Sequence, residues 1–147
     1  MKLPIDKFKS IMYIINVNKI KKEDTKMRET EKVIVRATDL LEASRFIIDS
    51  ITSEVLLIVR NGKFCLQSRT EDKDVIWTTG WKDVIIGEDC TYGFSAEDYL
   101  KILELVKGSF ENNDIDYVFF IFTKDRKLTR IATLDGSIWL DYAYKLN

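Results

Sequence analysis

Few side chains in this sequence are suited to nucleophilic or metal chemistry. It contains no histidine and only two cysteines, Cys65 and Cys90, among 147 residues. Two cysteines without histidine cannot build a tetrahedral Cys/His zinc site. Cys65 lies in an alternating segment where a cysteine usually acts as a small buried hydrophobe. We therefore expect no metal centre and reduced thiols, while a disulfide between the two cysteines stays open.

The remaining chemistry would have to come from carboxylates. Acids gather at Glu71, Asp72 and Asp74 and again at Asp114 and Asp116. On paper these groups could bind a metal ion, but clustered acids in turns are usually solvated. The chain has no phosphate-binding glycine loop, and no residues in a recognisable nucleophile–base context. The sequence predicts neither an enzyme nor a bound cofactor.

Composition restricts the class of protein further. Apolar residues make up 46% and charged residues 32%, and 23 basic against 24 acidic side chains leave a net charge of −1. A mixture of this kind supports a folded domain and gives no global attraction to nucleic acid or to acidic membranes. Because no apolar run approaches the ~20 residues of a membrane span and Met1–Asp6 does not begin an export signal, we expect an intracellular protein without a membrane partner.

The elements that would position any site are organised around one hairpin. Val55–Val59 is an apolar run rich in β-branched residues, and Lys63–Ser68 alternates apolar and polar residues. Between them stand Asn61 and Gly62, the pair that tolerates positive φ at both centres of a type I′ turn. We predict a buried β-hairpin.

The N-terminal part differs from the rest. Residues 1–30 form an extension in which Asn18–Lys32 is dense in charges of both signs and reads as a solvated linker. Before it, Phe8–Val17 is apolar, with side chains at helical spacing that other apolar residues blur, so that a short amphipathic helix and an extra strand both stay open. Those at helical spacing are Phe8, Ile11, Met12 and Ile15.

The compact part, residues 31–147, shows one order of elements twice. In the first unit, about 31–86, we predict a strand at Val33–Ala37, a helix over about Asp39–Ile51 in which Asp39 and Glu42 have capping-box spacing, the hairpin, and a strand at Val75–Trp81. The second unit, about 87–147, begins with a strand at Cys90–Phe94 and a helix that Ser95 caps and Gly108 can end. Three strands then follow, at Tyr117–Phe122, at Leu128–Thr133 after a turn at Asp125–Lys127, and at Ser137–Leu146 after a tight turn at Asp135-Gly136.

This repetition predicts an α+β fold. Two βαβββ units, each with one helix, favour antiparallel sheets with both helices on the same face. An unrelated α+β domain whose halves merely look alike is the alternative.

The order and spacing also resemble a known family. From Glu31 onward the chain resembles one domain of the DNA sliding clamps, the family of proliferating cell nuclear antigen and its archaeal and phage relatives. The residues that carry the resemblance are V-I-V-R-A with the helix after it, N-G-K-F-C-L-Q-S, C-T-Y-G-F-S-A-E-D-Y-L-K-I-L, and I-W-L-D-Y-A-Y-K-L. The resemblance implies a DNA-clamp-like domain whose helices line a ring around duplex DNA. With a single domain, the ring would need about six copies or a different partner subunit.

The resemblance also implies site residues. The DNA-facing candidates are Arg45, Lys82, Lys101 and Lys107, although acids outnumber bases on both predicted helices, unlike the family's DNA-facing helices. A pocket for DNA polymerase or other replication proteins would involve Leu66, Ile76 and Trp77, with Arg69 standing where the family commonly has methionine. For each residue the alternative is an ordinary role, as a solvated charge or as a packed side chain.

Two functions follow from these observations. The first is a sliding-clamp-like processivity factor, a homo-oligomer joined through sheet edges in the Val75–Trp81 and Ser137–Leu146 regions. The second is a clamp-fold interaction or regulatory protein that does not encircle DNA and binds a clamp or polymerase partner.

Overall fold

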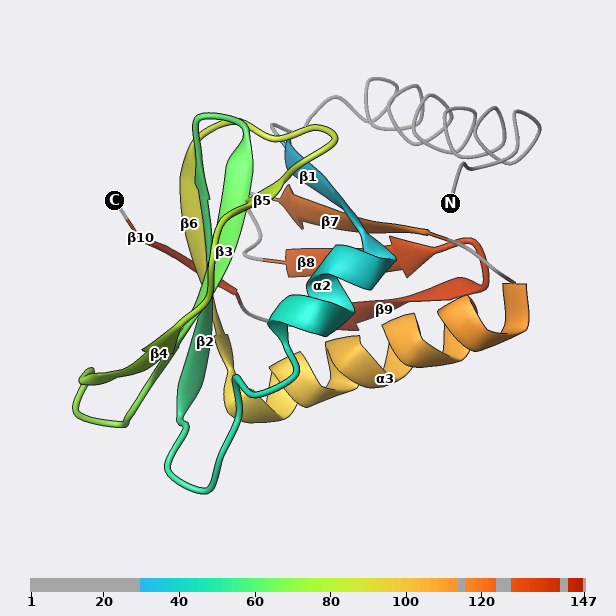
Figure 1. Ribbon diagram of the computed structural model, residues 1–147. Coiled ribbons are helices and arrows are strands. Elements are labelled where there is room, and N and C mark those ends of the chain that lie inside the picture. Colours follow the sequence, from blue (N-terminus) through green and yellow to red (C-terminus); the bar gives the residue numbers. More distant parts are fainter. Residues whose placement is uncertain (1–29, 114–115, 124–127, 141–142, 147) are drawn as a thin grey trace.

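The computed structural model describes residues 30–113, 116–123, 128–140 and 143–146 and contains two helices and ten strands among them (Figure 1). The predictions for residues 1–29, the turn at Asp125–Lys127 and Asp114 lie outside the described residues. The elements in chain order are β1 (Thr30–Arg36), α2 (Ala37–Ala43), β2 (Glu54–Arg60), β3 (Lys63–Arg69), β4 (Val75–Thr78), β5 (Lys82–Asp83), β6 (Cys90–Ser95), α3 (Ala96–Asn113), β7 (Tyr117–Thr123), β8 (Leu128–Thr133), β9 (Gly136–Leu140) and β10 (Tyr144–Leu146).

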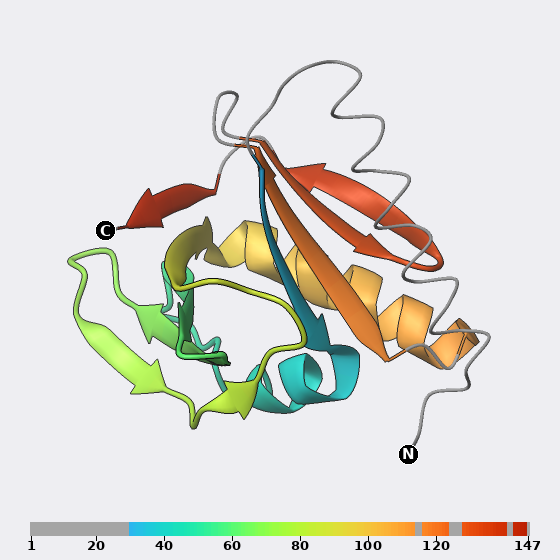
Figure 2. The same ribbon diagram turned by 90° about the horizontal axis from the view of Figure 1, so that it is seen from above.

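The strands form two antiparallel sheets. Sheet A has the order β1-β7-β8-β9, and sheet B has the order β10-β6-β2-β3-β4 with β5 also paired to β3. The two sheets stand at an angle to each other, and both helices lie side by side on one side of them (Figures 1 and 2). The predicted α+β class with antiparallel sheets and two helices is confirmed.

The predicted hairpin is also confirmed. β2 and β3 pair from Glu54↔Arg69 to Arg60↔Lys63, and the turn residues Asn61 and Gly62 have φ of 53° and 77°. These positive values are the ones a type I′ turn requires, because its backbone twist matches that of the flanking strands. The backbone N–H of Asn61 donates to Asp89 Oδ1 at 2.9 Å, which ties the turn to the segment before β6.

The sheets exchange strands between the two halves of the chain. β1, from the first half, pairs with β7 of the second, and β6, from the second half, pairs with β2 of the first. Sheet A therefore consists of three strands from the second half of the chain and β1 from the first half. Sheet B consists of strands from the first half together with β6 and β10 from the second half. Neither half can form its observed sheet alone.

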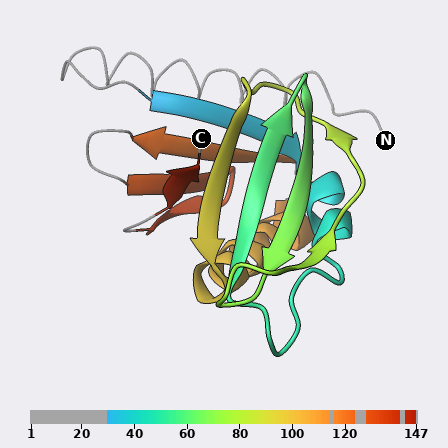
Figure 3. The same cartoon turned by 90° about the vertical axis from the view of Figure 1, so that its left-hand side faces the viewer.

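The main core lies between the inner faces of the sheets and the helices. Inward side chains of both sheets and side chains of both helices form this core, and its largest fully buried members include Phe64 of β3, Phe94 of β6, Tyr99 of α3 and Phe120 of β7. In Figure 3, which looks onto sheet B, both helices lie behind the sheet. Ser44, just after α2, and Tyr99 of α3 share a 2.6 Å hydrogen bond between their hydroxyls, which joins the two helical segments in the core.

The first helix is much shorter than predicted, since α2 covers Ala37–Ala43 and not Asp39–Ile51. The predicted capping box is wrong, because Asp39 and Glu42 both lie within the helix and Arg36 at the N-cap makes no side-chain cap hydrogen bond. The Thr38 hydroxyl in the first turn donates to Asp116 Oδ1 at 3.1 Å. At the other end, the Ser44 hydroxyl donates to the Leu40 carbonyl, and Asp49 Oδ1 accepts from the backbone N–H of Ile51. Short polar side chains that bond to nearby backbone favour turns over helix, and that explains the early end.

The second helix is longer than predicted. Ser95 Oγ accepts from the backbone N–H of Asp98 at 3.1 Å, so the predicted N-cap is confirmed. Gly108 does not end the helix, which continues to Asn113. Ser109 is buried and Phe110 packs against the core, so that tertiary packing outweighs the conformational freedom of the glycine.

Two strand boundaries also differ from the prediction. β4 ends at Thr78, because at Thr79 the side-chain hydroxyl, and not the backbone carbonyl, accepts from the backbone N–H of Leu66, at 2.8 Å. The last tight turn lies one residue earlier than predicted: Thr133 pairs with Gly136, which leaves Leu134 and Asp135 at its centre. Gly136 is therefore the first residue of β9. Ser137–Leu146, predicted as one strand, contains the end of β9 and all of β10.

Candidate interaction sites

The four basic residues predicted to face DNA lie on different parts of the helical side. Lys101 and Lys107 are on α3, Lys82 is in β5, and Arg45 follows α2 with its guanidinium 5.8 Å from the ring centre of Phe46. Two of the four are paired with acids. Lys82 Nζ lies 3.4 Å from Glu42 Oε1, and Lys101 Nζ lies 3.7 Å from Asp98 Oδ1.

The charge of the two helices is negative. α2 carries two acids and no base, a net charge of −2. α3 carries four acids and two lysines, again −2, so that the two helices together carry −4. Since sequence-independent attraction to duplex DNA comes from lysine and arginine near phosphates, these helices by themselves repel DNA.

The predicted partner-pocket residues do not gather in one place. Leu66 is fully buried in the main core and does not reach the surface. Ile76 is half-buried in β4. Trp77 is 53% exposed and lines a shallow groove of about 250 Å³ between β4 and the end of α2.

This aromatic groove contains residues that the sequence analysis did not select. Phe46 and Trp81 line it together with Trp77 and are 75% and 52% exposed, and Glu42 and Lys82 also line it. Large aromatic side chains near a charged pair are typical of protein-binding sites. Phe46 could have been found from the sequence, because it lies off the apolar stripe of the predicted first helix, where an aromatic residue has no core to enter.

A second hollow, of about 430 Å³, lies between α3 and the edge strand β9. Lys101, Glu104 and Leu105 line it from the helix, and Ile138, Trp139 and Leu140 line it from the strand. Trp139 is 57% exposed and its ring centre lies 5.8 Å from the guanidinium of Arg130.

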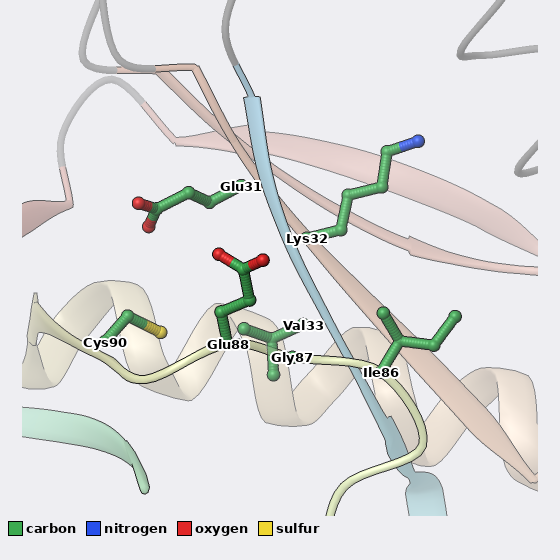
Figure 4. A pocket seen from close by; sticks show the side chains of 7 residues that line it. All are labelled: Glu31, Lys32, Val33, Ile86, Gly87, Glu88 and Cys90. Atoms are coloured by element: carbon green, nitrogen blue, oxygen red, sulfur yellow. The ribbon is translucent and has the colours of Figure 1, made fainter. Parts of the chain in front are cut away.

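A third hollow, of about 330 Å³, lies between β1 and the segment before β6 (Figure 4). Glu31 is held there by Lys145, whose Nζ donates at 2.6 Å, and by the hydroxyl of Tyr92. Burial, with the Glu31 charge, raises the pKa of the Cys90 thiol to about 11 and raises that of Tyr92 as well. A thiol that keeps its proton at neutral pH is a poor nucleophile. We therefore assign this cluster a structural role, in which Glu31 of β1 binds side chains of β6 and β10.

The acids considered as metal ligands have structural or solvent contacts. Asp116 accepts from Arg36 at 3.1 Å and from the Thr38 hydroxyl, while Glu71, Asp72 and Asp74 are exposed in a turn. Cys65 and Cys90 are free thiols, so they do not form the disulfide left open from the sequence. Within the described ranges, no group of three or more cysteine, aspartate or glutamate side chains is placed to hold a metal ion.

The sheet edges are available for pairing in two places. β9 ends sheet A and β4 ends sheet B, in the two regions predicted to supply edges, and Trp77 and Trp139 lie exposed on them. The β1 edge of sheet A is partly occupied, because the backbone N–H of Ile34 donates to the Ile86 carbonyl at 2.7 Å.

These features define an α+β protein with two antiparallel sheets, each of which contains strands from both halves of the chain. Comparison of the chain with protein-family models, with curated proteins and with solved structures gives no match. In the part of the chain that the structure describes, no helix is long and apolar enough to cross a membrane.

Proposed function

We propose that this chain is a sliding-clamp-like processivity factor, whose copies associate through sheet edges into a ring around duplex DNA and tether replication proteins. The observation that carries the proposal is the reciprocal strand exchange, β1 onto β7 and β6 onto β2. It supports reading the strand–helix–three-strand runs as duplicated units of one DNA-clamp-like domain, residues 31–147.

The edges support association. β4 and β9 lie at the ends of different sheets, so that pairing β4 of one copy with β9 of the next makes a head-to-tail contact. Contacts of this kind close into a ring when the rotation between copies allows it. We propose that about six copies do so.

The aromatic groove supports the tethering function. Its three exposed aromatic side chains, Phe46, Trp77 and Trp81, offer the kind of surface that anchors a short apolar segment of a partner. The partner would be DNA polymerase or another replication protein.

Electrostatics favours a second candidate function. Because the helices carry −4 together, and Lys82 and Lys101 are paired with acids, DNA inside the ring would depend on basic residues elsewhere. A clamp-fold interaction or regulatory protein that binds a clamp or polymerase without encircling DNA needs no such attraction.

Solution mass distinguishes the two candidates. Light scattering over a concentration series, with circular and with linearised duplex DNA, should give an assembly of about six chains that stays on the circle and is lost from the linear form. A monomer or dimer that ignores both DNAs would contradict the ring and favour the second candidate.

Two variants test the edge itself. Val75→Lys with Thr78→Lys adds two positive charges to β4 and should reduce the assembly to monomers, because an edge strand with lysines resists pairing. Glu111→Lys on α3 changes the net charge by the same +2 and should leave the mass unchanged. Equal masses for the two variants would show that β4 is not the contact.

A further inference from the structure

The outer face of sheet A carries an apolar cluster of its own. Its members alternate along the strands with residues of the main core, and Phe119 stands opposite Ile34 in β1 and Ala132 in β8. The cluster therefore lies on the face of sheet A turned away from the main core. We call it the outer cluster, and it consists of Ile34, Tyr117, Phe119, Ile121 and Ala132.

The outer cluster is buried although little of the described chain lies on it. Ile34 and Ile121 are 2% exposed and Phe119 is 5% exposed. Among the partly buried hydrophobic residues that the structure describes, Leu134 alone packs against the cluster. The Nε atom of Arg130, whose residue stands opposite Ile121, is also buried. Side chains on an uncovered sheet face would be open to water, so the burial of these residues raises the question of what covers them.

Composition selects the covering segment. Outside the described ranges the chain has residues 1–29 and the short stretches 114–115, 124–127, 141–142 and 147. Residues 124–127 read K-D-R-K and have nothing apolar to offer. Phe8–Val17 is the one apolar run among these segments, with Phe8, Ile11, Met12 and Ile15 at helical spacing.

The length of Phe8–Val17 and its connection to sheet A agree with this assignment. Ten residues at helical rise span about 15 Å, close to the roughly 13 Å that a strand covers from residue 117 to residue 121. Residues 18–29 lead directly into Thr30, the first residue of β1, which is itself a strand of sheet A. Twelve residues can extend to about 40 Å, more than the roughly 14 Å width of a four-stranded sheet.

We propose that the apolar segment Phe8–Val17 covers the outer cluster of sheet A in its own chain. The outer face of sheet A is then a binding surface for an amphipathic segment, and that segment belongs to the same chain. This inference is independent of the ring: it concerns the face of sheet A and makes no use of the β4 or β9 edges.

A cysteine placed under the cover tests this assignment. Ala132→Cys puts a thiol in the outer cluster, and Cys65 and Cys90, both buried, report unfolding of the whole chain. We measure alkylation of each thiol by mass spectrometry of peptides in the full chain. Adding Ile11→Asp and Ile15→Asp should speed labelling of the introduced thiol by about tenfold or more while Cys65 stays protected, since local opening exposes only this face.

The matched control is Ser10→Asp with Tyr13→Asp. It adds the same two charges on the opposite side of the helical pattern and should leave the labelling rate unchanged. Rapid labelling of the introduced thiol without any acid substitution, or equal rates in the two acid variants with Cys65 protected, would overturn the proposal. Protection that disappears on dilution would place the cover on a second copy and overturn the assignment to the same chain.

A second pair of substitutions is used if the acid variant unfolds, so that all three thiols are labelled. Ile11→Ala with Ile15→Ala removes apolar contacts without adding charge. Faster labelling of the introduced thiol alone supports the proposal, and an unchanged rate contradicts it.

Discussion

The outer faces of the two sheets are closed in different ways. On sheet B, the ring of Tyr144 lies across Gly93, and Lys73 Nζ reaches Glu54 Oε2 at 3.1 Å. Arg60 donates to the Thr91 hydroxyl on the same face at 2.9 Å. On sheet A, the outer cluster is apolar, and of the partly buried hydrophobic residues that the structure describes, Leu134 alone packs on it.

The difference shows two solutions to one problem. A sheet between a core and water must satisfy or cover its second face. Sheet B combines polar anchors and one aromatic ring with buried apolar side chains such as Leu56. Sheet A has the apolar outer cluster, which we propose the segment Phe8–Val17 covers. The two faces should therefore respond differently to mutation.

The largest effect is expected in the outer cluster. Phe119→Ala should lower the free energy of unfolding by about 3 kcal/mol or more, because Phe119 is packed like a core residue and its removal leaves a cavity. Denaturant unfolding measures this loss. Gln67→Ala, on the outer face of sheet B, serves as the control and should stay within about 0.5 kcal/mol. A loss below about 1 kcal/mol for Phe119→Ala would mean that the face is not packed as a second core.

The next effect should appear at the ring on sheet B. A Cβ atom at Gly93 would lie 2.3 Å from Cζ of Tyr144, so Gly93→Ala must displace the ring and should cost about 1–3 kcal/mol. In a Tyr144→Ala background the same substitution should cost much less. A double-mutant cycle of unfolding free energies measures this coupling. Equal costs in both backgrounds would show that Tyr144 is not what closes this face.

A smaller effect is expected at the polar anchor of sheet B. Glu54 is buried, and Lys73→Met removes the charge that approaches its carboxylate. Because the Lys73 side chain is 63% exposed, solvent already screens the pair, and we expect a loss of about 1 kcal/mol in denaturant unfolding. Methionine keeps the chain length at a position with φ of 71°. Lys63→Met removes a pair whose acid, Asp83, is 81% exposed, and should change nothing measurable. Equal effects of the two substitutions would contradict a role for the burial of Glu54.

The smallest effect at neutral pH concerns Cys90, which packs in the main core beside the first strand of sheet A. Its pKa is about 11 when folded and 9.0 otherwise, so the folded chain holds the proton more tightly. That contribution to stability is complete below pH 9 and is lost as the pH rises toward 11. Unfolding measured at pH 7, 9 and 10.5 should show a steeper decline for the natural chain than for Cys90→Ala. Parallel declines would contradict the raised pKa.

Local chemistry made much of the fold predictable. Asn61-Gly62 specifies its turn because few other pairs adopt positive φ twice, and Ser95 caps α3 because its hydroxyl meets an amide three residues on. β7 could be predicted because Tyr117–Phe122 is a continuous run of aromatic and β-branched residues. Each of these signals acts within a few residues.

The misplaced boundaries lie where distant contacts compete with local ones. Helix periodicity continued past Ala43, but Ser44 bonds to both Leu40 and Tyr99 and the helix ends there. Gly108 suggested a helix end, but the packing of Phe110 carries α3 onward. Of the candidate sites, Trp77 was found from the sequence, and Phe46 and Trp81 join it only through the approach of β4 to the end of α2.

The sequence by itself determined the order of the longer elements, the hairpin with its Asn61-Gly62 turn, the cap of α3 and the absence of histidine chemistry. Tertiary structure alone decided that β1 joins β7 and β6 joins β2, which residues form the aromatic groove, and that an apolar cluster lies on the outer face of sheet A. The physical reason is the sequence separation of the interactions. Turns and caps depend on backbone and side chains a few residues apart. Strand partners depend on which pairing buries the most apolar surface over the whole chain, and a short stretch of sequence does not contain that information.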